Sequence, residues 1–208
     1  MRAILRRWAE QDAGLSLTEL LVALSLTVVV MAAGWALMYT GTVLADTTDA
    51  RQQATDESRN VLAALTTELR QAVEITEDAG AFASALPRSC EFYSDIDHDG
   101  LPELVRYRVV QRELRRSIAQ PTTLVPPFVY GAYSSEEVMA NGLPSSWTGN
   151  VFTYYDGGNP PAEKHNGSKA EISAVQINLK NSKSVGARSA QVDLSTLVKI
   201  RSIHNSID

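Results

Sequence analysis

The chain is poor in the residues that build most covalent and catalytic sites. It contains a single cysteine, Cys90, so it cannot form a disulfide within itself, and its three histidines do not share a spacing typical of a metal site. No Ser/His/Asp or Cys/His combination and no glycine-rich phosphate loop is apparent. We therefore expect a protein that is not an enzyme, with Cys90 as a small buried side chain on a strand.

Basic charge is also scarce. The sequence has 19 Lys and Arg residues against 24 Asp and Glu residues, which gives a formal net charge of −5 at pH 7. A surface that coats nucleic acid is basic, because it must neutralise phosphates. The acidic balance argues against direct binding of nucleic acid.

Charge is missing altogether from residues 20–45. About twenty apolar residues in a helix span the roughly 30 Å core of a bilayer, so this segment predicts one transmembrane helix. Three arginines precede it and two aspartates follow it: Arg2, Arg6, Arg7, Asp46 and Asp49. The arginines on the N-terminal side predict a cytoplasmic N-terminus and an extracytoplasmic remainder of the chain.

Glu19 lies at the start of the apolar segment, where an ordinary membrane anchor does not explain it. An ionisable side chain within a span costs on the order of 2.5–3.5 kcal/mol on insertion scales, so it indicates a function and a partner. The apolar segment itself contains no Lys, Arg or His. A cation that could pair with Glu19 is an α-amino group released by cleavage after Gly14, on the same chain or on a neighbour.

The residues around Glu19 resemble the class III leader junction of type IV prepilins and type II secretion pseudopilins. The match runs Gly14-Leu15-Ser16-Leu17-Thr18-Glu19-Leu20-Leu21-Val22-Ala23-Leu24. The resemblance implies that a membrane prepilin peptidase cuts after Gly14 and methylates the new amine of Leu15. It also implies an assembly role for Glu19, the fifth residue of the mature chain. The family usually begins the mature chain with Phe or Met, whereas this sequence has Leu15.

The same resemblance implies a function, a set of partners and a location. It predicts a structural subunit, either a minor pilin or a pseudopilin, that waits in the cytoplasmic (inner) membrane before it joins a surface or periplasm-spanning filament. The expected partners are the prepilin peptidase, other pilins or pseudopilins, and an inner-membrane assembly platform driven by a cytoplasmic ATPase. Weaker similarities to larger minor pilins and J-type pseudopilins lie in Phe92–Gly100, Val151–Asp156 and Leu197–Arg201.

Other interpretations of the N-terminus and of the function remain open. A secretory signal is disfavoured, because the apolar run exceeds the 7–15 residues of a signal core and the small residues Ala13 and Gly14 precede it. One alternative is a calcium-dependent adhesin or binding module at the tip of a filament. Another is an unrelated single-pass membrane protein.

The apolar pattern and the resemblance together predict four parts: a leader (1–14), a membrane or filament-core helix (15–45), an amphipathic continuation of that helix (46–78) and a β-sheet head domain (79–208). Apolar residues at steps of three and four, such as Val61, Leu65 and Leu69, carry the helix prediction to about residue 77. We expect an α+β fold, the pilin fold, in which a long N-terminal helix packs on an antiparallel β-sheet.

Alternating apolar and polar residues predict six strands in the head domain. They are Cys90–Ser94, Glu103–Val110, Glu113–Ile118, Val151–Tyr155, Ile172–Lys180 and Val192–Arg201. One dry and one wet face per strand is typical of an antiparallel sheet. Residues 121–127, 134–149 and 156–168 are rich in turn formers and are predicted to be loops.

Three carboxylates in five residues, Asp95, Asp97 and Asp99, precede Gly100. Alternate carboxylates around a glycine turn can converge on a hard cation such as Ca²⁺, which takes six to eight oxygens. The EF-hand pattern is incomplete, because Arg106 stands where the bidentate Glu belongs, although Glu103 could contribute an oxygen instead. A plain hairpin turn rich in Asp and Gly explains the same residues, so both interpretations stay open.

A basic cluster follows the aspartates on two of the predicted strands. It comprises Arg106, Arg108, Arg112, Arg115 and Arg116, interspersed with acidic and apolar residues. We interpret it as a solvated face of the sheet. The alternative is a docking face for an acidic neighbour.

Overall fold

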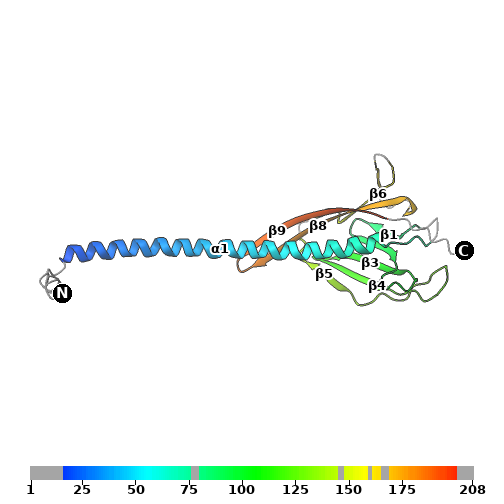
Figure 1. Ribbon diagram of the computed structural model, residues 1–208, viewed down its shortest axis with the longest axis horizontal. Coiled ribbons are helices and arrows are strands. Elements are labelled where there is room, and N and C mark those ends of the chain that lie inside the picture. The colour runs from blue at the N-terminus through cyan, green and yellow to red at the C-terminus, as the bar shows by residue number, and fades with distance from the viewer. Residues whose placement is uncertain (1–15, 76–79, 145–147, 159–160, 165–168, 201–208) are drawn as a thin grey trace, which may run out of the picture. The chain divides into compact units, whose positions relative to one another are not determined.

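The structure is a computed structural model that describes residues 16–75, 80–144, 148–158, 161–164 and 169–200. The chain divides into two compact units, Met1–Asp46 and Thr47–Asp208, and we call the second unit the head. Helix α1, Leu17–Arg70, begins in the first unit and ends in the head (Figure 1). The strands are β1 (Phe82–Leu86), β2 (Ser89–Ser94), β3 (Glu103–Val110), β4 (Glu113–Ala119), β5 (Glu137–Asn141), β6 (Phe152–Asp156), β7 (Glu163–Lys164), β8 (Ile172–Val185) and β9 (Arg188–Lys199); a 3₁₀ turn, η1 (Lys169–Glu171), precedes β8.

The described strands form two antiparallel sheets in the head. The first sheet has the order β1-β2-β3-β4-β5, and the second has the order β7-β6-β8-β9. Two-residue turns close the β3–β4 and β8–β9 hairpins, with Gln111 (φ 56°) and Gly186 (φ 57°) at the first central position. A positive φ at this position suits the right-handed twist of the strands that flank a tight hairpin.

The part of α1 in the head presents one apolar stripe to the sheets. Its buried residues recur every three or four positions: Ala50, Ala54, Ser58, Val61, Leu65 and Leu69. This spacing keeps them on one helical face, which the two sheets cover. Hydrogen bonds tie the helix to both sheets, because Ser94 donates to the carbonyl of Glu68 and Asn181 donates to the carbonyl of Ala54.

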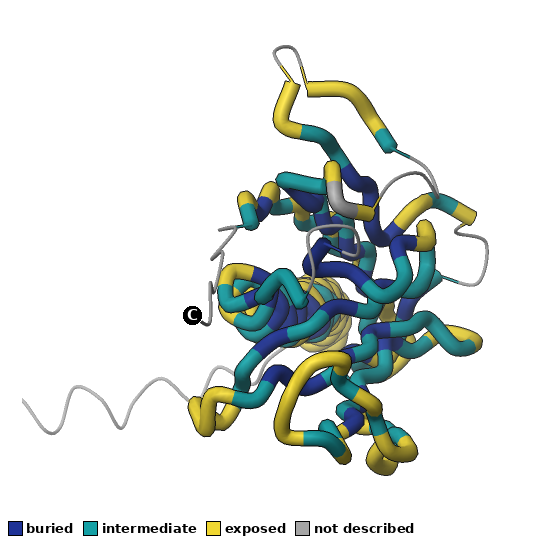
Figure 2. The backbone as a smooth tube through the Cα atoms, turned by 90° about the vertical axis from the view of Figure 1, so that its right-hand side faces the viewer, coloured by how far each residue is buried: buried dark blue, intermediate teal, exposed yellow. Residues whose placement is uncertain are grey.

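The core of the head lies where the stripe of α1 meets the inner faces of the two sheets. Tyr154, Phe82, Phe92 and Tyr107 form its aromatic part, and in this order the ring centroids of neighbouring members are 5.9, 6.4 and 6.3 Å apart. Figure 2 shows the buried segments gathered inside the head and the exposed segments along its loops. The fold is α+β, with a long N-terminal helix packed against antiparallel β-sheets, and this confirms the predicted fold class.

The helix prediction was wrong at its C-terminal end. The sequence predicted helix to about residue 77, but α1 ends at Arg70. The backbone N–H of Val73 instead donates to the carbonyl of Tyr93 at 2.8 Å, and Ala72 pairs with Ser94. Pairing with β2 therefore replaces the helical hydrogen bonds that the amphipathic pattern favoured.

Three strands were not predicted, and two of them lie in segments predicted to be loops. β5 falls within residues 134–149 and β7 within residues 156–168, while β1 has no clear alternation in its Phe-Ala-Ser-Ala-Leu sequence. Each of the six predicted strands has a counterpart, and β3 has the predicted bounds, Glu103–Val110. Arg201, the predicted end of the last strand, lies outside the described residues. Local β-propensity is weak in the remaining strands, so the sequence does not predict them. They form because they pair with neighbouring strands.

Candidate functional site

The sequence predicted functional residues in two regions. The first is the N-terminal junction around Gly14, Leu15 and Glu19. Gly14 and Leu15 lie outside the described residues, so the predicted cleavage site stays a prediction. Glu19 is described, and it lies exposed in the first turn of α1. The partial positive charge at a helix N-terminus favours a carboxylate there.

Ser16 caps α1 directly in front of Glu19. The Ser16 hydroxyl oxygen accepts a hydrogen bond from the backbone N–H of Glu19 at 3.2 Å, and the carbonyl of Ser16 accepts from the N–H of Leu20 at 3.1 Å. Ser-x-x-Glu at the start of a helix is the capping-box sequence, in which either Glu or Gln can occupy the fourth place. The cap uses the backbone N–H of Glu19, so it does not depend on the charge of the side chain.

The α1 residues that follow Glu19 expose a long apolar surface. Among the described residues, α1 is the helix that is long and apolar enough to cross a membrane. Nearly all of its large apolar side chains from Leu20 to Leu44, including Trp35 and Leu37, are exposed within the chain. The polar side chains Ser25, Thr27, Thr40 and Thr42 donate to carbonyls three or four residues earlier at 2.8 Å. Their hydrogen-bonding capacity is thus met inside the helix, which suits an apolar environment.

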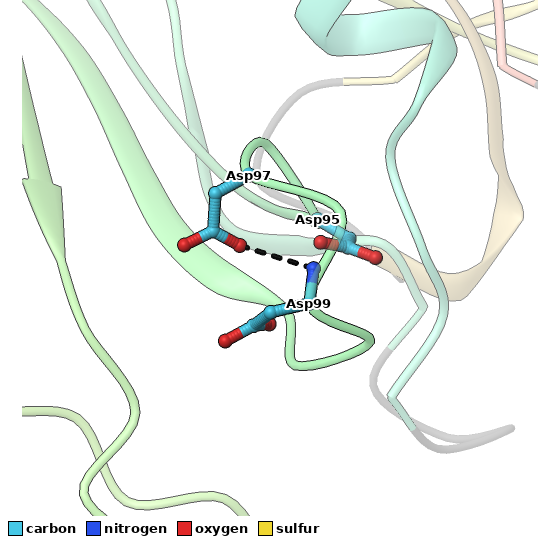
Figure 3. Close-up of side chains that lie close together, drawn as sticks. All are labelled: Asp95, Asp97 and Asp99. Carbon is cyan, nitrogen blue, oxygen red and sulfur yellow. Dashed lines mark hydrogen bonds between the residues drawn. The ribbon is translucent and has the colours of Figure 1, made fainter.

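The second region is the aspartate turn, Asp95–Gly100, between β2 and β3. Asp95, Asp97 and Asp99 each offer a carboxylate oxygen, and these oxygens lie within 4.8 Å of one another. Figure 3 shows the three carboxylates around the turn, with Asp97 accepting from the backbone N–H of Asp99 at 3.2 Å. The turn requires positive φ at His98 (62°) and Gly100 (88°). Three carboxylates at this spacing could hold a metal ion.

One oxygen in the aspartate turn has no hydrogen-bond partner among the described residues. Asp95 Oδ2 accepts from the N–H of Gly100 at 3.2 Å, whereas Asp95 Oδ1 is buried and unpaired. A buried carboxylate oxygen without a partner loses its hydration without compensation. A cation would supply the missing partner and offset the repulsion among the three carboxylates.

Glu103 lies beside the aspartate turn but is not a member of the group of three. Its side chain is 1% exposed, and its Oε2 accepts from the backbone N–H of Ile96 at 2.8 Å. Burial raises the pKa of Glu103, and the negative charges of Asp97 and Asp95 raise it further. Glu103 therefore braces the turn from within, and its role as a fourth calcium ligand stays a prediction.

A second loop, residues 121–130, lies at the same end of the first sheet as the aspartate turn. We call it the apolar loop, because Leu124, Val125 and Val129 are 75%, 69% and 56% exposed. Thr123 fixes its shape by donating to the carbonyl of Pro127 and accepting from the N–H of Val129. The ring of Tyr130 at its base stacks on Tyr93 with centroids 5.5 Å apart. The sequence predicted a loop at residues 121–127 but not its exposed apolar side chains, although residues 117–135 carry no charge.

Four of the five arginines of the basic cluster form ion pairs within the head, and Arg112 donates to the carbonyl of Leu143 at 3.0 Å. Glu136 forms ion pairs with Arg106, Arg108 and Arg115, and Arg116 pairs with Glu68 at 2.6 Å. The guanidinium of Arg106 also lies 3.7 Å from the ring centroid of Tyr133. The arginines on the outer face of the first sheet therefore hold residues 133–136 against it, and this supports a structural role over docking of an acidic neighbour.

Cys90 is buried, as predicted. Burial raises the pKa of its thiol to about 12. A thiol with so high a pKa is not a nucleophile at neutral pH.

A scan against protein-family models and a search of curated proteins both find no match to this chain.

Proposed function

We propose that this chain is a prepilin-type structural subunit, a minor pilin or pseudopilin, that is cut after Gly14 and assembled into a filament. The observation that carries the proposal is the combination in α1 of Glu19 in the first turn and a following surface of exposed apolar side chains. A membrane covers such a surface before assembly, and identical helices of neighbouring subunits cover it afterwards. The head, attached to the same helix, then faces solvent.

Glu19 has two separable roles in this proposal. Its backbone N–H donates to the Ser16 hydroxyl that caps α1, and a Gln at this position keeps that hydrogen bond. Its negative charge pairs with the α-amino group of Leu15, either within the subunit or on the neighbour that arrives next. Only the second role requires a carboxylate.

The substitution Glu19→Gln tests the role of the charge. We expect the variant to be cleaved and inserted in the membrane normally, while the fraction recovered in sheared filaments falls roughly tenfold, equivalent to about 1.4 kcal/mol per subunit contact. Asp46→Asn, which removes a carboxylate at the other end of the apolar segment, is the matched control and should assemble normally. Equal assembly of Glu19→Gln and the wild type would refute the charge pairing.

The proposed partners follow from this function. They are the prepilin peptidase, the other pilins or pseudopilins of the filament, and an inner-membrane assembly platform. The proposed location is the cytoplasmic membrane before assembly, with the head on the outer side. The acidic balance of the chain supports a filament subunit that does not itself bind nucleic acid.

A second candidate function, which is compatible with the first, is calcium-dependent binding by the head. We propose it because the aspartate turn holds a buried, unpaired carboxylate oxygen and lies at the same end of the first sheet as the exposed apolar loop. Ca²⁺ in the turn would fix the surface next to the loop, and Leu124 and Val125 would supply the apolar contact. Asp95, Asp97 and Asp99 would ligate the ion, with Glu103 as the predicted fourth residue.

Thermal unfolding of the full chain in detergent tests the calcium site. With a dissociation constant near 10⁻⁴ M, as extracellular sites have, 10 mM Ca²⁺ should stabilise the head by about 2.7 kcal/mol. The double variant Asp97→Asn/Asp99→Asn should lose this shift, whereas Asp193→Asn on the second sheet should retain it. An unchanged melting temperature of the wild type in Ca²⁺ would argue for a plain turn, and the same shift with Mg²⁺ would argue against a site specific for calcium.

A further inference from the structure

β9 is the longest edge strand among the described residues. It forms one end of the second sheet and pairs with β8 over twelve consecutive positions, from Lys199 opposite Ala174 to Arg188 opposite Val185. This register has no shift, whereas the pairings of the edge strands β1 and β5 are each interrupted by one. β7, at the other end of the second sheet, has only two residues. A long, regular edge is a template for another strand.

The backbone groups that β9 directs outward can be assigned from the ladder. The N–H of Ile200, directly after the strand, donates to the carbonyl of Ser173 on the β8 side at 2.9 Å. In an antiparallel pair, alternate residues bond to the same neighbour, so the even-numbered residues of β9 bond to β8. The odd-numbered residues therefore turn N–H and C=O away from the sheet; they are Ser189, Gln191, Asp193, Ser195, Leu197 and Lys199. None of these outward groups has a backbone partner within the described chain.

The usual protections of an open edge are missing from β9. The strand contains no proline, no glycine and no bulge, and charge occurs at only three positions, Arg188, Asp193 and Lys199. Its inner-face residues Val192 and Leu194 remain partly exposed, and Leu197 on the outer face is 56% exposed. The side chains of β9 are thus only partly covered by the chain's own residues.

The charges of β9 are complementary to those of a second, antiparallel β9. If two copies are related by a two-fold axis at Thr196, Asp193 of each lies opposite Lys199 of the other, and Ser195 lies opposite Leu197. All four are odd-numbered residues, so these positions exchange the outward hydrogen bonds, as an antiparallel ladder requires. Opposite charges directly across two strands stabilise the pair. Asp193 also pairs with Lys180 of its own chain at 3.1 Å. In the joined sheet its carboxylate would therefore lie between Lys180 of the same copy and Lys199 of the other.

We propose that β9 is an interface between two copies of this chain, which pair antiparallel about Thr196 and join their second sheets into one continuous sheet. On the inner face, Leu194 of each copy then meets Val198 of the other, which covers part of the surface left open in one copy. Such an isologous contact closes at two copies.

The proposed pair differs from the contacts of the proposed filament. Figure 1 shows the β8–β9 hairpin alongside α1 in the head, and Lys183 and Glu57 form an ion pair between them. A two-fold axis normal to the joined sheet reverses the direction of β9 in the second copy, and it reverses the direction of this part of α1 as well. The pair therefore joins heads that point in opposite directions, so it links two separate assemblies and is not a contact between neighbours in one polar filament.

Disulfide trapping of the detergent-solubilised full chain tests the register. Thr196 would face its own copy in a non-hydrogen-bonded pair with Cα atoms about 4.5 Å apart, a separation that a disulfide can bridge. Thr196→Cys should therefore give a cross-linked dimer on mild oxidation. The wild type should not, because its Cys90 is buried. Leu194→Cys is the matched control two residues away, and it should stay monomeric since it lies opposite Val198.

A charge swap in the Thr196→Cys background tests the complementarity. Asp193→Lys alone and Lys199→Asp alone should each lower the dimer yield about tenfold, because each places like charges opposite one another twice. The combination Asp193→Lys/Lys199→Asp should restore the yield, even though Lys180 then faces a lysine within its own chain. Three outcomes would overturn the proposal: no dimer of a folded Thr196→Cys chain, equal trapping of Leu194→Cys, or failure of the combined swap to restore pairing.

Discussion

Glu68 shows how one side chain fastens α1 to the first sheet. Its carboxylate accepts from the hydroxyl of Tyr107 at 2.8 Å and pairs with the guanidinium of Arg116 at 2.6 Å. The side chains of Glu68 and Arg116 are only 13% and 15% exposed, so water cannot fully replace either partner. The nearest other carboxylate to Arg116 is that of Glu137, at 3.7 Å.

We predict that Glu68→Gln lowers the free energy of unfolding by about 2 kcal/mol, since it leaves a partly buried guanidinium without its close counter-ion. Chemical denaturation of the full chain in detergent measures the effect. Glu171→Gln is the control, because Glu171 pairs with Lys164 at 2.8 Å on the surface and should matter by less than about 1 kcal/mol. Losses of equal size in the two variants would contradict the buried role of Glu68.

At the residue scale, the sequence predicted what is local and missed what is distant. Three carboxylates and a glycine within six residues predict the aspartate turn. The place of Glu19 before an uncharged run predicts that it lies at the start of the apolar helix. The pairing of Glu68 with Tyr107 joins residues 39 positions apart, and the sequence contains no local pattern that links them. The same holds for Glu136, whose three arginine partners were predicted to form a solvated face.

At the element scale, the predicted strands were those with a clear alternation of apolar and polar side chains. β3 and β9 show this alternation, whereas β1 consists mainly of small residues and β5 carries a register shift. The end of α1 was missed for a related reason. The amphipathic pattern continues past Arg70, but Ala72 pairs with Ser94 and the helix ends before it.

Gly142, directly after β5, illustrates how closely the two sheets approach. Its φ is +117°, its carbonyl accepts from the N–H of Ser182 at 2.9 Å, and a Cβ there would collide with the backbone oxygen of Ser182. A side chain is thus excluded both by backbone conformation and by space. The close approach of the chain after β5 to the end of β8 therefore depends on this glycine.

We predict that Gly142→Ala destabilises the head by more than about 2 kcal/mol, because the backbone of one sheet must move. Gly157→Ala is the matched control: a Cβ there meets only Ser173 at 3.7–3.8 Å, and we expect a change within about 0.5 kcal/mol. Thermal unfolding of both variants measures the difference. A melting temperature of Gly142→Ala equal to that of the control would show that the two sheets do not meet as described.

At the scale of the whole molecule, the two units place opposite demands on their surroundings. The head buries a core of apolar residues within itself and forms ion pairs, so most of its surface is suited to water. The described part of the first unit buries almost none of its apolar surface, so it requires either lipid or other helices. A subunit that moves from a membrane into a helical filament core satisfies both demands in turn.

The most direct test of this account is the intact mass and N-terminal sequence of the protein isolated from its native membrane. The account predicts a chain that starts at Leu15, and one about 14 Da heavier than its calculated mass if the new amine is methylated. A chain that still starts at Met1, or one cut after Ala45, would contradict the account, because the apolar helix would then be an ordinary anchor or a discarded signal.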